Sequence, residues 1–91
     1  MEELKVDLTV MNEEGLHARP ASQLVQALQG MECQVFLAKV DDGEEVDAKS
    51  ILGVMMLAAE RGTKMSVRAK GKDSQKAIEA VSRILSEKGG S

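Results

Sequence analysis

Apolar and polar residues alternate in two segments of the chain, and this alternation is typical of half-buried β-strands. In residues 3–10 and again in residues 63–71, every second residue is apolar. The inward set is Leu4, Val6, Leu8, Val10, Met65, Val67 and Ala69. We therefore expect one strand near the start of the chain and another after its middle.

The centre of the chain predicts a β-hairpin. Residues 33–40 are rich in β-forming residues, and "DDG" at 41–43 is a strong turn signal. Residues 44–49 then resume with Val46 and Ala48 facing inward. With "DDGEE" at its turn, this hairpin is expected to protrude.

Three other segments have the period of amphipathic helices. The first starts at Ala18 and ends before Gly30, which stands where a C′ glycine is common. The second, residues 50–62, has Ser50 as its N-cap and Gly62 at its close, and Gly53 inside it predicts a short or irregular helix. The third begins at a cap, Asp73 or Ser74, and ends at Lys88 and Gly89.

The predicted element order is β-α-β-β-α-β-α. One-sided strands and helices imply an α+β fold of two layers, in which helices cover one face of a sheet and water covers the other. The length of 91 residues predicts a single domain, which we place at residues 1–88, followed by a flexible tail at residues 89–91.

Composition excludes several classes of protein. A net charge of −3 and 1% aromatic residues disfavour nucleic-acid binding. Cys33 is the only cysteine, so no disulfide forms within the chain, and no apolar run is long enough for membrane insertion. These features predict a cytoplasmic protein. We expect no metal site, because His, Cys and carboxylates lack ligand spacing, and no cofactor, because the chain is too short to enclose one.

The stretch "GLHARPAS", residues 15–22, contains the only histidine and the only proline. A single histidine beside a loop is usually a surface or capping residue. His17, however, falls where the first helix starts, so the first-turn amides and the helix dipole would form an anion site beside its ring. Pro20 is tolerated in a first turn, and Arg19 adds a guanidinium that can bind two oxygens of an anion. This combination suits a phosphoryl group carried on His17.

Two stretches in this order, "GLHARPAS" and "AKSILGVMMLAAERGT" (residues 48–63), resemble the HPr family, the histidine-containing phosphocarriers of the bacterial phosphoenolpyruvate-dependent sugar phosphotransferase system. The resemblance covers essentially the whole chain. It implies a four-stranded antiparallel sheet of order 1-4-2-3 with three helices on one face. It further implies that His17 accepts phosphate on Nδ1 from enzyme I and passes it to enzyme IIA. The backbone of Ala18 and Arg19 would hold the phosphate, and the Arg19 side chain would pair with its oxygens.

The resemblance also implies two features around the second helix. Ser50 matches a serine that a dedicated HPr kinase/phosphorylase modifies, although a capping role alone would explain a serine there. Leu52 and Met55 match an exposed docking patch for enzyme I, enzyme IIA and the kinase, and we add Leu16 and Ile51 as candidates.

Alternatives to the sugar carrier remain open on the residues alone. The same fold serves a nitrogen-related phosphorelay, and phospho-Ser50 could create a docking surface for a transcriptional regulator. An inert domain with a capping histidine is a third reading. Glu13 and Glu14 lie close to His17 and could alter the choice of partner. We expect the chain to act as a monomeric, stoichiometric carrier and not as an enzyme.

Overall fold

A computed structural model of the chain describes residues 3–86. Its strands are β1 (Glu3–Thr9), β2 (Cys33–Lys39), β3 (Val46–Asp47) and β4 (Lys64–Gly71). Its helices are α1 (Ala18–Leu28), α2 (Ile51–Met56) and α3 (Ser74–Ser86). The predicted β-α-β-β-α-β-α order is confirmed. The predicted tail, residues 89–91, and the predicted helix end at Lys88 and Gly89 lie outside the described residues.

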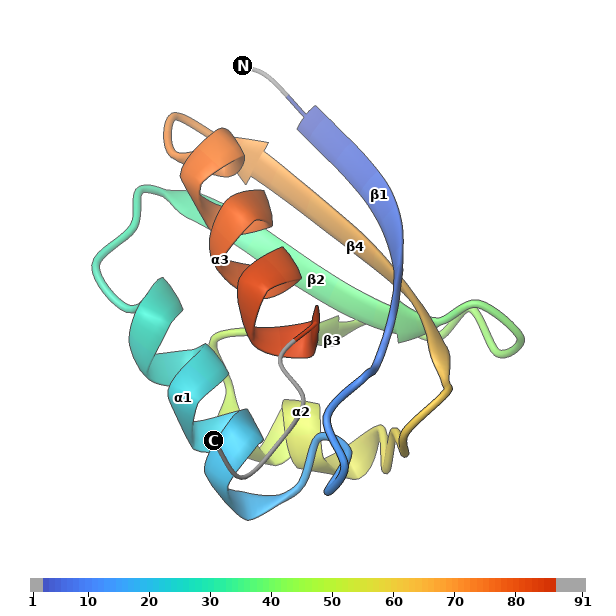
Figure 1. Cartoon of the computed structure of the whole chain (residues 1–91). Helices are drawn as coiled ribbons and strands as arrows, with labels where there is room; N and C mark the ends of the chain where they lie inside the picture. Colours follow the sequence, from blue (N-terminus) through green and yellow to red (C-terminus); the bar gives the residue numbers. More distant parts are fainter. Residues whose placement is uncertain (1–2, 87–91) are drawn as a thin grey trace.

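The four strands form one antiparallel sheet in the order β1-β4-β2-β3, as expected. Figure 1 shows α1 and α3 side by side over one face of this sheet, with α2 across the end of α1 where that helix begins. In the centre of the sheet, Val6 pairs with Val67, which in turn pairs with Leu37. Thus β1 and β2 both end where β4 begins, and the loops that follow them gather at that end of the molecule.

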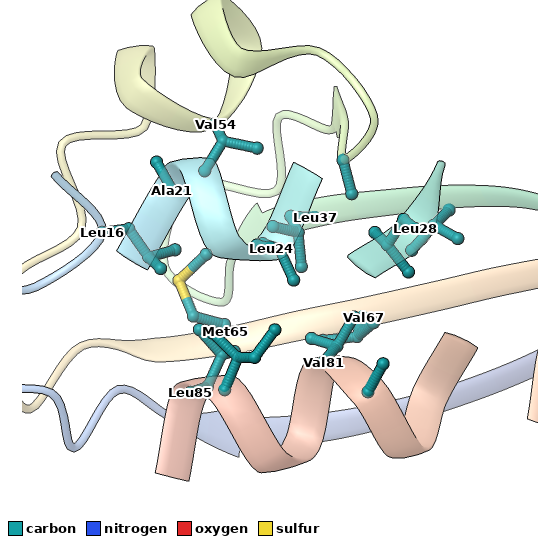
Figure 2. Packing of buried hydrophobic residues seen from close by; sticks show 14 of the residues in the cluster. Leu16, Ala21, Leu24, Leu28, Leu37, Val54, Met65, Val67, Val81 and Leu85 are labelled. Carbon is teal, nitrogen blue, oxygen red and sulfur yellow. The ribbon is translucent and has the colours of Figure 1, made fainter. Parts of the chain in front are cut away.

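The strand alternation predicts which face of the sheet is buried. In β4, Met65, Val67 and Ala69 are fully buried, whereas the side chains between them are half-buried or exposed. Figure 2 shows Met65 and Val67 packed against Val81 and Leu85 of α3 and beneath Leu24 of α1. Burying these aliphatic side chains contributes on the order of 1.5–3 kcal/mol each, and it holds the helices on the sheet.

Helix α2 is short, as Gly53 predicts, but the prediction that Gly62 ends it is wrong. The helix ends at Met56, and Ala58 has a positive φ of 51°, the left-handed conformation that commonly terminates helices. Residues after Ala58 form hydrogen bonds with distant segments. Leu16 N–H donates to the Ala59 carbonyl, and Gly62 N–H donates to the Val10 carbonyl. These tertiary bonds take the place of another helical turn. The return strand is also shorter than expected, because only Val46 and Asp47 pair with β2.

The first helix begins and ends as predicted, and the third helix begins as predicted. Gly30 follows α1 with a positive φ of 83°, so it serves as the expected C′ residue. Helix α3 starts at Ser74, and the Ala77 N–H donates to the Asp73 carbonyl, which makes Asp73 the residue in the N-cap position. Within residues 3–86, no helix combines the length and the apolar character that crossing a bilayer requires.

Candidate functional site

The loop before α1 is fixed by close backbone contacts at the two residues that precede His17. Gly15 has a positive φ of 70°, and a Cβ at this position would lie 2.4 Å from the Ala59 carbonyl oxygen. The next residue, Leu16, donates its N–H to the same oxygen at 2.8 Å, and its side chain is fully buried in the core. Only glycine therefore fits at position 15, and the backbone immediately before His17 is anchored to the α2–β4 loop.

The burial of Leu16 corrects one prediction. We expected Leu16 to belong to the docking patch, but its side chain has no exposed surface. In Figure 2 it points into the core, beside Met65. Its role is to anchor the loop, because its apolar side chain gains more from burial in the core than from exposure at the surface.

His17 is the N-cap residue of α1, as its place in the sequence predicts. Its backbone is extended, with φ −100° and ψ −157°, and its carbonyl accepts the first helical hydrogen bond from Ala21 N–H at 2.8 Å. The imidazole makes no capping hydrogen bond and is exposed. Its ring nitrogens are therefore accessible from the solvent while its backbone is fixed.

The first turn of α1 offers amide donors beside this ring. Ala18 and Arg19 are the first two helical residues, so their N–H groups have no acceptor within the helix. Pro20 comes third, has no N–H to leave unpaired, and is buried. The Arg19 side chain is exposed. His17 therefore stands at the positive end of an 11-residue helix, next to the residues that carry two unpaired amides, and Arg19 is two positions away in the sequence.

Ser50 occupies the N-cap of α2, as expected. Its Oγ accepts a hydrogen bond from Gly53 N–H at 3.2 Å, and the residue is half-buried. Its neighbour Lys49 donates from Nζ to the Met31 carbonyl at 2.7 Å, and the Lys49 carbonyl accepts from Gln29 Nε2 at 3.3 Å. Lys49 thus ties the start of α2, and with it Ser50, to the end of α1.

Helix α2 exposes much of its apolar surface. Ile51, Leu52 and Met55 are 39%, 71% and 40% exposed, and Met56 is the most exposed at 80%. Val54 is buried and packs the helix against the core. The three predicted docking residues on this helix therefore lie where a partner can reach them, and Met56, which spacing alone could not assign, extends the same surface.

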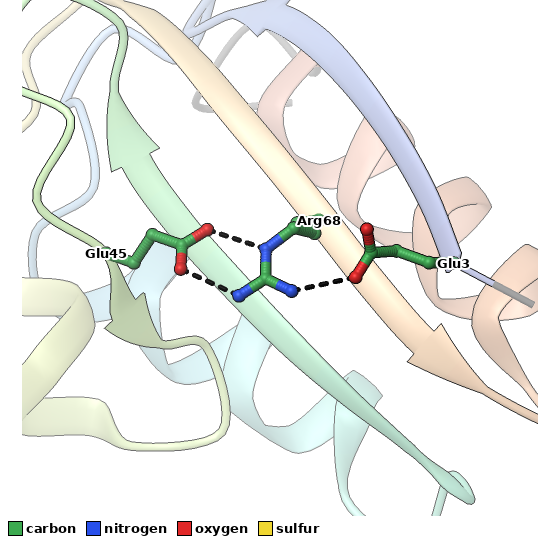
Figure 3. Close-up of polar contacts among 3 residues, drawn as sticks. All are labelled: Glu3, Glu45 and Arg68. Atoms are coloured by element: carbon green, nitrogen blue, oxygen red, sulfur yellow. Dashed lines mark hydrogen bonds and ion pairs between the residues drawn. The ribbon is translucent and has the colours of Figure 1, made fainter.

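One prominent polar cluster was not foreseen from the sequence. The Arg68 guanidinium on β4 donates two bonds to the Glu45 carboxylate, each 2.8 Å, and a third to Glu3 Oε1 at 2.9 Å (Figure 3). It also lies 4.5 Å from the centre of the Phe36 ring. The Arg68 bonds lower the pKa of the Glu45 carboxyl, and the two carboxylates raise the pKa of Arg68. No sequence signal links these residues, because they stand 23 and 65 positions apart.

Among residues 3–86, no group of three or more His, Cys, Asp and Glu side chains is arranged to hold a metal ion. Cys33, at the start of β2, is half-buried, and burial raises the pKa of its thiol. It lies on the strand end opposite to the loops around His17.

Comparison with known proteins gives the family of the chain. The family model described as "PTS HPr component phosphorylation site" matches residues 4–87. The chain belongs to the HPr family. The phosphocarrier protein HPr of Xylella fastidiosa is 44% identical over 82 residues, which is 90% of each chain. The structure is similar to the crystal structure of HPr from Bacillus anthracis, with a TM-score of 0.85 and 34% identity over 91% of this chain and 96% of that one.

A second HPr-like relative is also similar. The HPr-like protein Crh of Bacillus subtilis is 44% identical over 73 residues, covering 80% of this chain and 84% of Crh. A crystal structure of Crh is described as a swapped, intertwined dimer. Our expectation that the present chain is a monomer therefore stays a prediction.

Proposed function

We propose that this HPr family member carries a phosphoryl group on His17 from phosphorylated enzyme I to enzyme IIA during sugar uptake. In the first step, the Nδ1 lone pair attacks the phosphorus, an N–P bond forms, and the bond to the donor breaks. In the second step, the acceptor attacks the phosphorus, a bond between acceptor and phosphorus forms, and the N–P bond to His17 breaks. Because the chain itself is the acceptor in the first transfer and the donor in the second, it works as a stoichiometric carrier in the cytoplasm and not as an enzyme.

The observation that carries this proposal is the placement of an exposed imidazole at the N-cap of α1. A phosphoryl group on the ring would lie at the positive end of the helix, within reach of the Ala18 and Arg19 amides. The Arg19 guanidinium would pair with its oxygens through charge-assisted hydrogen bonds. These donors stabilise the transferring group without requiring a metal ion from this chain.

Replacement of His17 and Arg19 tests the proposal. With radiolabelled phosphoenolpyruvate and enzyme I, His17→Ala should take up no label, because the accepting nitrogen is gone. Arg19→Ala should still be labelled, but about 10–100-fold more slowly, because one charge-assisted contact to the phosphoryl group is lost. Gln23→Ala, on the exposed face of the same helix, serves as the control and should transfer at the wild-type rate. Acid-labile label on a folded His17→Ala protein would contradict the assignment.

We propose in addition that Ser50 is a regulatory phosphorylation site for an HPr kinase. Support comes from its place beside the exposed residues of α2, and from the similarity to Crh, which one structure describes as the catabolite repression HPr. A phosphate at a helix N-cap is tolerated by the dipole, so its effect would fall on partners approaching α2.

Mass spectrometry tests the Ser50 proposal. After incubation with ATP and an HPr kinase, wild type and the control Ser82→Ala should gain one phosphate, whereas Ser50→Ala should gain none. Phosphorylated wild type should then accept phosphate from enzyme I about ten-fold more slowly or worse, because two negative charges oppose docking. Absence of a mass shift on Ser50 in the wild type would remove this regulatory function.

The similarity to Crh also supports a second candidate, in which regulation is the main function. In that case phospho-Ser50 would present a surface to a transcriptional regulator. A nitrogen-related phosphorelay would use the same His17 chemistry with different partners. Exchange of label with sugar-type and nitrogen-type enzymes I and IIA, measured side by side, separates these possibilities.

A further inference from the structure

A groove runs between the end of α2 and the β2–β3 hairpin. Its volume is about 420 Å³. Its acidic lining, which we call the acidic wall, includes Asp42 and Glu44, and its apolar lining includes Val46, Met56 and Leu57. We call this feature the hairpin groove. The 80% exposed Met56 side chain belongs both to this groove and to the apolar surface of α2, so the two are continuous.

The acidic wall is held in place on the sheet. At the base of the hairpin, Gly43 N–H donates to the Lys39 carbonyl at 2.8 Å, and Val40 N–H donates to the Lys64 carbonyl at 2.9 Å. At its other end, the bidentate pair between Arg68 and Glu45 fixes the loop to β4 (Figure 3). Because both ends are tied, the carboxylates between them project from a positioned loop and not from a freely moving one.

The segment that carries this wall is strongly acidic. Residues 41–47 contain five carboxylates and no lysine or arginine. Glu45 is paired with Arg68, and Asp47 accepts from Lys49 N–H, but neither Asp42 nor Glu44 forms an ion pair with any residue of 3–86. Among residues 3–86, Lys39 is the one cation that lines the groove. Carboxylates beside apolar side chains therefore present a negative potential to a protein that docks on α2.

The hairpin groove is structurally joined to His17. Ala58 lines the groove, and the carbonyl of the next residue, Ala59, accepts the hydrogen bond from Leu16 N–H. Leu16 directly precedes His17. A partner that brings a phosphoryl group to His17 and covers α2 as far as Met56 would also contact the groove, because Met56 belongs to both surfaces.

We propose that the hairpin groove binds an arginine or lysine side chain of enzyme I, and that Arg68 is a positioning residue for it. The methylene stem of such a side chain would lie along Met56 and Val46, and its cation would meet Asp42 and Glu44. The acidic hairpin thus selects an enzyme I whose docking face carries a basic residue next to an apolar one. This inference rests on the proposed carrier function.

Steady-state transfer from phosphorylated enzyme I of the same organism tests the proposal. The double variant Asp42→Asn/Glu44→Gln should raise KM about three- to ten-fold at low salt, on the order of 50 mM, with kcat unchanged, because rim charges act on association. The increase should shrink at about 500 mM salt, where charges are screened. Arg68→Gln should raise KM at both salt concentrations, because the wall loses its tie to β4 although the Glu45 carboxylate is freed. Glu79→Gln, on α3, is the matched control and should leave KM unchanged.

A second phosphoryl donor distinguishes failure of the groove proposal from failure of the proposed carrier function. Labelling of His17 by phosphoramidate, a small donor without a docking surface, should be equal in all variants and shows that the carrier site is intact. If wild type accepts phosphate from enzyme I and the double variant has the same or a lower KM, the groove proposal is wrong. If neither wild type nor variant accepts phosphate from enzyme I although phosphoramidate labels both, the carrier function and the groove proposal both fail.

Discussion

At the scale of single residues, backbone conformation decides how the site is held. Gly15 and Ala58 both have positive φ, but only Gly15 is a residue that adopts it without cost. Ala58 is the only non-glycine residue with positive φ among residues 3–86, and it stands at the C′ position of α2, where glycine is the usual residue. The molecule therefore tolerates local strain at the end of the helix that carries its exposed apolar surface.

Ala58→Gly should stabilise the protein. The native φ of 51° costs an L-residue about 1 kcal/mol, and glycine removes that cost, less its greater freedom in the unfolded chain. We expect the free energy of unfolding in urea to rise by about 0.5–1 kcal/mol. As a control, Ala27→Gly inside α1 should lower it by a similar amount, because that position is helical. A less stable Ala58→Gly variant would show that the Ala58 methyl contributes more by packing than it costs in strain.

At the scale of elements, the β2–β3 hairpin is the part of the fold that depends on a charged contact. Strand β3 has only two residues, so ladder hydrogen bonds alone hold the hairpin weakly. The Arg68–Glu45 pair adds a geometrically specific contact across the open face of the sheet, and Phe36 supports the guanidinium from below.

This contact should be released by acid. The pKa of Glu45 is lowered by Arg68, so the stabilising effect of the pair is complete above the ordinary glutamate pKa of about 4.3 and is lost as pH falls through the lowered value. An NMR titration should show Glu45 titrating below the ordinary glutamate pKa, with the Arg68 Hε signal shifting in parallel. In Arg68→Gln, Glu45 should titrate in the ordinary range. Equal titration of Glu45 in both proteins would contradict the contact in solution.

At the scale of the whole molecule, two layers leave one face of the sheet and two strand edges open. The edges are β1 and β3. Strand β1 carries charged side chains at Glu3, Lys5 and Asp7, and β3 is too short to template a partner. Charged and short edges oppose sheet extension between molecules.

We therefore expect a monomer. Sedimentation velocity at micromolar concentrations should give the mass of one chain, in contrast to the intertwined dimer described for Crh. The experiment should be repeated over a ten-fold range of concentration. A species of twice the mass that persists on dilution would contradict the monomer.

Much of the fold and the centre of the site could be predicted because they depend on local patterns. Alternation marked β1 and β4, helical spacing marked α1, and the loop-to-helix join placed His17 at an N-cap. The roles of Ala18 and Arg19 in holding phosphate, and of Ser50 in regulation, remain predictions for the experiments above.

Only the tertiary structure decided the end of α2, the burial of Leu16 and the Arg68 cluster. Each depends on groups far apart in the chain: Leu16 bonds to Ala59, and Arg68 bonds to Glu45 and Glu3. Periodicity reports which side of an element is apolar, because that is a local property of spacing. It does not report which distant carbonyl will accept an amide or which carboxylate will meet a guanidinium, because those partners are set by the packing of the whole chain.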